Sequence, residues 1–179
     1  MNPLLSLYDR VVQLVLRQEG WLLPSLARLI FAAVLLGYFW NSAATKLDGP
    51  FSPTLGGYAQ IFPRAFEAAG YNAAEMGLWQ TMIVLFGAWA EFVLPALIVL
   101  GLFTRLAALG MAGFVVVQSL TDLYGHGSDA GAWFDRASDA LILDQRALWA
   151  LLLAILVVKG PGPLSADWLL RKATVRVPA

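Results

Sequence analysis

The chain has 179 residues, of which 59% are hydrophobic and only 13% are charged. Charged residues make up about a quarter of a typical soluble domain, so this composition excludes an ordinary soluble fold. The 12 Lys and Arg residues balance the 12 Asp and Glu residues, which leaves no excess positive charge for binding nucleic acid. With no cysteine and a single histidine, His126, one copy can form no thiolate metal site, iron–sulfur cluster or bis-histidine haem site.

Residues 1–20 are predicted to form an interfacial helix on the membrane surface. Between residues 4 and 17, apolar residues recur at helical spacing opposite a polar face. The apolar stripe holds Leu4, Leu7, Val11, Leu14 and Val15, and the polar face holds Asp9, Arg10, Gln13 and Arg17. Such a helix buries its apolar stripe in lipid and keeps its charges in water.

Four apolar runs are long enough to cross a bilayer, which needs about 20 residues of helix. The predicted spans are 22–41, 78–102, 106–124 and 140–159, and Gly160 to Pro163 end the last one. Residues 160–179 read as a tail. The expected fold is therefore all-α, a single integral membrane domain over 1–179 built as a four-helix bundle.

The charged residues are distributed unevenly between the two sides of these spans. The side that carries both termini holds seven Lys or Arg residues and three acidic residues. The other side holds four Lys or Arg residues and eight acidic residues. The net charges are about +4 and −4, and the positive-inside rule places both termini in the cytoplasm. The lipid bilayer is thus the first expected partner.

Two charged residues, Arg28 and Glu91, fall inside predicted spans, where ionisable groups are costly and often functional. Pro95 follows Glu91 by four residues and leaves the Glu91 carbonyl without its helical donor. The simplest way to neutralise both charges is a buried Arg28–Glu91 pair. The alternatives are that Arg28 extends to the headgroups, and that Glu91 is purely structural or protonated.

Polar residues also gather at a similar depth near the outer ends of the first and third spans. Asn41 and Thr45 lie one helical step apart, as do Gln118 and Asp122, so each pair shares a face. The two faces could form a ligand site, or simply hydrogen-bond between helices.

Two outer segments are long and polar, 48–77 and 125–139. The first is predicted to contain a short helix over 58–69, broken at Pro63, that lies on the bundle like a lid. The second holds His126. Together with Asp122 and Asp129 it could hold a metal, but the spacing matches no ligand pattern, and no metal site is expected.

Several motifs resemble those of the DoxX family. The stretch Leu26 to Phe31, then Trp40 and Lys46-Leu47, resembles the opening of that family's sequences, although Asn41-Ser42-Ala43 replaces the usual glycine. Glu91 followed by the segment 97–108 resembles the middle, and 159–167 resembles its GxGxLSxD close. The resemblance implies a bacterial four-helix membrane protein, and it places the family's motif arginine, lysine and glutamate on Arg28, Lys46 and Glu91.

The resemblance also suggests functions. The family includes the small subunit of thiosulfate:quinone oxidoreductase and components of other membrane oxidoreductase complexes. We therefore expect an accessory or quinone-interacting subunit in the bacterial inner membrane, with quinone as a possible cofactor and a protein partner in the complex. The alternatives are a non-catalytic scaffold that recruits a partner, and a small transporter, which the absence of paired interrupted segments disfavours.

Overall fold

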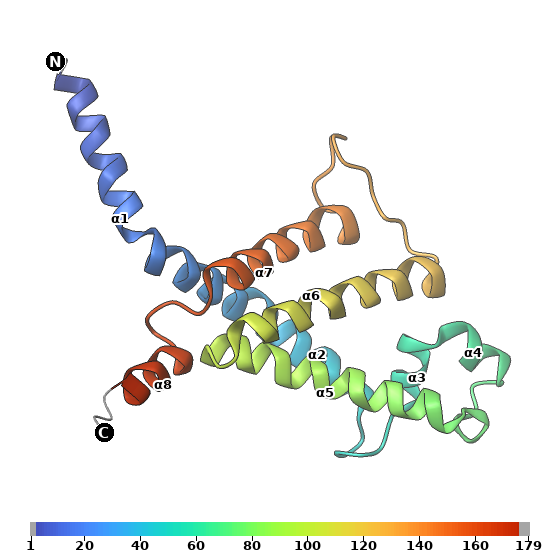
Figure 1. Cartoon of the computed structure of the whole chain (residues 1–179). Coiled ribbons are helices and arrows are strands. Elements are labelled where there is room, and N and C mark those ends of the chain that lie inside the picture. Colours follow the sequence, from blue (N-terminus) through green and yellow to red (C-terminus); the bar gives the residue numbers. More distant parts are fainter. Residues whose placement is uncertain (1–2, 176–179) are drawn as a thin grey trace.

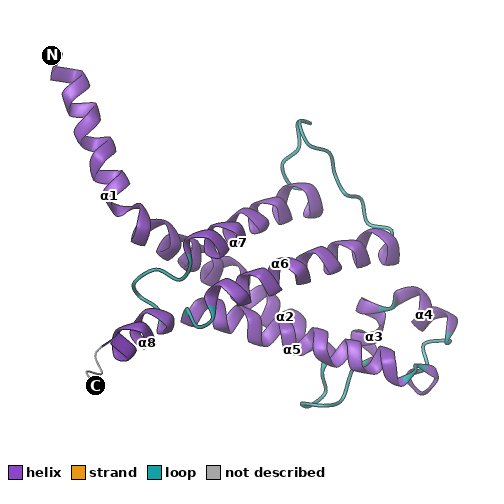
Figure 2. Cartoon of the chain, viewed as in Figure 1, coloured by secondary structure: helices purple, strands orange, loops and turns teal. Residues whose placement is uncertain are grey.

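The computed structural model describes residues 3–175, and in this range the chain forms helices and loops only (Figures 1 and 2). The α-helices are α1 (Pro3–Phe31), α2 (Gly37–Lys46), α3 (Leu55–Ile61), α4 (Pro63–Ala68), α5 (Leu78–Leu100), α6 (Thr104–Leu120), α7 (Ala147–Lys159) and α8 (Ala166–Val175). Wider π-helical segments are Ala32–Leu36, Thr121–His126 and Leu141–Arg146, and a short 3-10 turn spans Ala73–Glu75.

Four continuous helical stretches are long and apolar enough to cross a membrane: Leu4–Lys46, Leu78–Leu100, Thr104–His126 and Leu141–Lys159. This confirms the all-α membrane bundle with four spanning helices. The predicted amphipathic helix is the first part of α1, and it runs without a break into the first span. Its apolar residues remain exposed, among them Leu7, Val11 and Leu14. In Figure 1 this part of α1 projects beyond the bundle.

The first span continues to Lys46, five residues past the predicted end. Polar side chains support this last turn, since the Lys46 ammonium donates to the Ser42 carbonyl at 3.1 Å and the Thr45 hydroxyl to the same carbonyl at 2.7 Å. The hydropathy pattern stops at Asn41 because it does not count such bonds.

The two parts of the long first span pack against different neighbouring helices. Its α1 part packs on α7 and its α2 part packs on α5, while α5 packs on α6 and α6 on α7. The start of α1 and α8 lie at one end of the bundle, here named the terminal side. Helices α3 and α4 and the connection 127–140 lie at the other end, the distal side (Figure 1).

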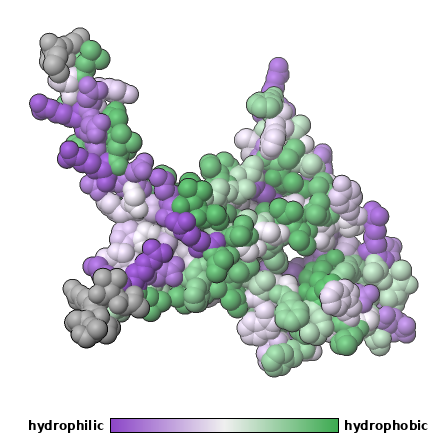
Figure 3. Space-filling model, in the orientation of Figure 1, coloured by the Kyte–Doolittle hydropathy of each residue, from purple (hydrophilic) through white to green (hydrophobic). Residues whose placement is uncertain are grey.

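The main core extends from the terminal side to the middle of the bundle. It consists of Ala27, Phe31, Leu35, Phe39, Ile98, Ala107, Ala108, Met111, Val115, Leu153 and Leu156. Large apolar side chains also cover the outside of the bundle, as Figure 3 shows, including Phe86, Val116 and Leu151. An apolar surface around an apolar core is typical of a protein surrounded by lipid.

The predicted lid forms two short helices, with the break just before Pro63. Helix α3 packs on α2 and α5, and the Tyr58 hydroxyl lies 2.7 Å from the Thr81 hydroxyl of α5. Tyr58, Phe66, Met76 and Val84 form a second, smaller core beneath it. The lid is therefore fixed to the distal side of the bundle.

Three segments far apart in sequence meet on the terminal side, in a cluster that we call the terminal junction: Arg28, Gly101, Thr104, Ser165 and Asp167. Gly101 ends α5 in the left-handed conformation, at φ 70°, and the Leu102 N–H bonds back to the Leu97 carbonyl at 3.0 Å. This Schellman cap closes the helix. A Cβ on Gly101 would lie 2.4 Å from that of Ser165.

Asp167 caps the start of α6. Its carboxylate accepts the backbone N–H groups of Phe103 at 2.8 Å and Thr104 at 3.0 Å, and also the Thr104 hydroxyl. Partial burial alone would raise the pKa of Asp167, but these bonds from Thr104 and Phe103, together with the charge of Arg171, lower it below its ordinary value. The cap is therefore ionised at neutral pH and is lost only in strong acid, as the pH falls through this lowered pKa.

We predict that Gly101→Ala destabilises the bundle, because alanine is strained at positive φ and its methyl group meets Ser165. The loss should exceed about 1 kcal/mol in unfolding free energy. Gly113→Ala is the matched control, since a Cβ there meets nothing within 4 Å and the residue lies inside α6. Denaturant unfolding in detergent measures both variants, and equal stability of the two would contradict the role given to Gly101.

Candidate binding cavity

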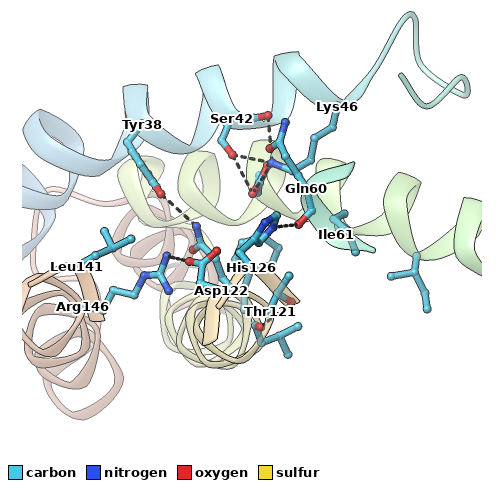
Figure 4. A pocket seen from close by; sticks show the side chains of 16 residues that line it. Tyr38, Ser42, Lys46, Gln60, Ile61, Thr121, Asp122, His126, Leu141 and Arg146 are labelled. Carbon is cyan, nitrogen blue, oxygen red and sulfur yellow. Dashed lines mark hydrogen bonds and ion pairs between the residues drawn. The ribbon is translucent and has the colours of Figure 1, made fainter. Parts of the chain in front are cut away.

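A cavity of about 330 Å³ opens in the distal half of the bundle (Figure 4). It is lined by Tyr38, Ser42, Lys46, Gln60, Ile61, Ile83, Gly87, Glu91, Phe114, Val117, Gln118, Thr121, Asp122, His126, Leu141 and Arg146. These residues come from α2, α3, α5 and α6 and from the π-helical segments Thr121–His126 and Leu141–Arg146. Such segments shift the side chains that follow them and are frequent at functional sites.

A buried ion pair occupies one wall of the cavity. The Lys46 ammonium lies 2.8 Å and 3.1 Å from the two carboxylate oxygens of Glu91, and both side chains are almost fully buried. The Ser42 hydroxyl lies 2.6 Å from the ammonium and donates to Glu91 at 3.2 Å. Glu91 lies near the middle of α5, so the pair sits deep in the apolar part of the bundle.

The predicted Arg28–Glu91 pair is wrong. The guanidinium of Arg28 lies in the terminal junction and donates to backbone carbonyls there, those of Ile98 (3.1 Å), Val99 (2.5 Å), Pro161 (3.0 Å) and Leu164 (2.6 Å). The Val99 carbonyl lacks a helical donor because α5 ends at Leu100, the Ile98 carbonyl also accepts the Gly101 N–H at 3.1 Å, and the segment after α7 is not helical. Arg28 therefore closes a helix end, and Lys46 is the partner of Glu91 that the prediction missed.

A second ion pair crosses the cavity between the last two spans. Arg146 donates to Asp122 at 2.5 Å and to the Ser119 hydroxyl at 3.0 Å, and Arg146 is only 3% exposed. Arg146 falls inside the predicted span 140–159 but was not among the predicted site residues. The available signal was its depth, which matches that of Asp122 on the preceding span.

Of the two predicted polar faces, one faces the cavity. Gln118 and Asp122 both line it, and the Gln118 amide donates to the Tyr38 hydroxyl at 3.1 Å. Asn41 is exposed and does not line it. Within residues 3–175, two buried polar atoms of the lining residues have no hydrogen-bond partner, Oε1 of Gln118 and Nε of Arg146.

His126 lies at the mouth of the cavity, and its Nε2 is 2.9 Å from the backbone carbonyl oxygen of Gln60 on α3. Asp122 is held by Arg146, and the Asp129 carboxylate accepts the Gly131 N–H. These three residues were weighed together as metal ligands. The described residues contain no group of three His, Asp or Glu side chains placed to hold a metal ion.

The cavity combines charged and polar groups with apolar walls. Lys46, Arg146 and Tyr38 are hydrogen-bond donors, while Ile83, Phe114 and Val117 supply apolar surface. Sites of this size and composition bind small molecules, with the polar groups fixing the orientation. The arrangement suits a flat apolar body that carries carbonyl or hydroxyl oxygens.

We predict that Lys46 and Glu91 depend on each other. Lys46→Met leaves a buried carboxylate unpaired and Glu91→Leu leaves a buried ammonium unpaired, so each should lower the unfolding free energy by about 3–5 kcal/mol. The double variant should be more stable than either single variant. Denaturant unfolding in detergent tests this.

The pair Lys159–Glu19 is the control. Its side chains are 34% and 52% exposed, so Lys159→Met should cost about 1 kcal/mol or less. Strictly additive losses in the Lys46 and Glu91 variants would show that the two groups do not interact.

Comparison with known proteins gives one match. A family model described as DoxX matches residues 23–122, more than half of the chain. The matched region contains Arg28, Lys46, Glu91, Gln118 and Asp122, and it ends before Arg146. No curated protein and no solved structure shows significant similarity to the chain.

Proposed function

The chain belongs to the DoxX family of membrane proteins, and we propose that it is a quinone-binding accessory subunit of a membrane redox complex. The observation that carries the proposal is the distal cavity, in which the buried Lys46–Glu91 pair faces apolar walls deep in the bundle. Burying such a charged pair in the membrane costs desolvation free energy, and ionisable residues retained there commonly have a function.

The lining fits a quinone head group at both of its oxidation levels. Carbonyl oxygens would accept hydrogen bonds from Nε of Arg146, which is otherwise unpaired, and from the Tyr38 hydroxyl, whose oxygen accepts from Gln118. A quinol hydroxyl would donate to the free Oε1 of Gln118. Phe114 and Ile83 would contact the ring. The bound quinone would supply electron transfer, and the residues of this chain would orient the ring and hold protons at Lys46 and Glu91.

A lipid-soluble ligand also needs room for its tail. Tyr38 is 40% exposed and Leu141 is 38% exposed, and both line the cavity. In a bilayer this side of the bundle faces lipid. A head group could therefore occupy the cavity while its isoprenoid tail lies among the acyl chains, which explains how a volume of about 330 Å³ can be sufficient.

The proposed function also specifies the membrane and the orientation of the bundle in it. Membership of the family implies a bacterial inner membrane, and the Lys and Arg distribution favours the terminal side in the cytoplasm. In the fold, α8 and the start of α1 both lie at that end (Figure 1). The distal cavity would then face the periplasmic half of the membrane.

Solvent extraction of the purified protein, followed by chromatography, tests the proposal. We expect quinone in the wild type and a marked loss in Glu91→Gln, because the neutral amide no longer holds the Lys46 ammonium in place. Glu19→Gln is the matched control, with the same chemical change at an exposed site on α1. Absence of quinone from the wild type, or equal amounts in Glu91→Gln, would refute the proposal.

A second candidate function, recruitment of a partner protein, is favoured by the connection between α6 and α7. This segment projects from the bundle (Figure 1), with Trp133 61% exposed and Phe134 fully exposed at positive φ. Exposed aromatic residues are typical anchors of protein interfaces. In a redox complex, the same surface could hold the subunit that supplies electrons.

Deletion of residues 127–138 should abolish copurification of such a partner while the bundle stays folded. The measurement is affinity purification from native membranes, with size-exclusion chromatography as the check on folding. A partner that still copurifies with the shortened protein would exclude this segment as the binding surface.

A further inference from the structure

We infer that the cavity exchanges water, and with it protons, only with the distal side of the membrane. This deepens the proposed function, because it states on which side a ligand bound at Lys46 and Glu91 would take up or release protons. The inference concerns the protein alone, and its test requires no ligand.

The polar and apolar parts of the bundle interior are separated along its length. The residues that line the cavity extend from the middle of the spans, where Glu91 lies, to their distal ends, where His126 lies. The buried core lies mainly toward the terminal side, where Phe31, Ile98 and Met111 have no exposed surface. None of the buried core residues lines the cavity. A dry apolar layer thus separates the ion pair from the terminal side.

The terminal junction forms a second closure beyond this layer. Arg28 joins the end of α5 to the segment that follows α7, through four backbone carbonyls. Asp167 joins the start of α8 to the start of α6, and its own N–H donates to the Gly101 carbonyl at 2.9 Å. The polar side chains of the terminal junction are therefore bonded to one another or to backbone groups.

The distal end of the cavity is polar and reaches the surface. His126 lines the cavity and is exposed, and Gln60 and Thr121 beside it are partly exposed. In Figure 4, His126 lies against Gln60 of the lid helix α3, whose backbone carbonyl oxygen it contacts. Hydroxyl, amide and imidazole groups thus continue from Ser42 to the outside, so water can hydrogen-bond along the whole path.

The free-energy cost of bringing an ion into the cavity differs between the two sides of the membrane, and this difference decides from which side the cavity is accessible. Moving a small ion through an apolar layer without partners costs many kcal/mol, whereas a polar, hydrated path carries little cost. Access from the distal side should therefore be available, and access from the terminal side should be absent.

Cysteine labelling tests this directly, because the natural sequence contains no cysteine. Ser42→Cys and Gln118→Cys place a thiol in the cavity, and Met111→Cys places one in the apolar layer. Arg10→Cys and Asp135→Cys mark the terminal and distal sides. Each variant is reacted, in membrane vesicles of both orientations, with a small charged methanethiosulfonate that does not cross the bilayer.

We expect both cavity cysteines to react only when the Asp135→Cys marker reacts, and Met111→Cys to react from neither side. Reaction of a cavity cysteine together with the Arg10→Cys marker, or from both sides, would overturn the inference. The inference would also be overturned if the cavity cysteines reacted only with a membrane-permeant reagent. The same holds if they did not react at all in a protein that elutes as a folded species. The quinone assay fails or succeeds independently of these outcomes.

Discussion

The interaction on which the rest of the distal half depends is the buried pair of Lys46 and Glu91. Neither charge could remain in the bundle without the other, because burying a lone ion costs far more than burying a close pair. The pair explains why the first span keeps its helical form to Lys46, beyond the hydrophobic run. It also fixes α2 against α5 at the depth where the cavity begins.

Different interactions hold the two halves of the molecule together. In the terminal half, stability comes from an apolar core and from backbone groups capped by Arg28, Gly101 and Asp167. In the distal half, polar side chains line a cavity of about 330 Å³, and only the smaller core beneath the lid is apolar and closely packed. Close packing in one half allows the other half to stay open, since the helices are already held together by their contacts near Met111 and Leu156.

The sequence was sufficient to predict the four spans, because a long apolar run in a bilayer can satisfy its own backbone hydrogen bonds only as a helix. It also identified Glu91 as exceptional. It did not identify the partner of Glu91, because Arg28 and Lys46 lie on the same long helix at different depths, and only packing decides which of them reaches α5. Tyr38 and Arg146 were missed for a related reason, since their place in the cavity depends on π-helical turns that hydropathy does not reveal.

The capping of α6 by Asp167 has a consequence for biogenesis. The ribosome makes Asp167 after all four spans, so the turn between α5 and α6 leaves the translocon without its cap. The N–H groups of Phe103 and Thr104 then bond to water until α8 has been synthesised and its carboxylate has docked. Assembly of this bundle is therefore completed only after translation of its last helix.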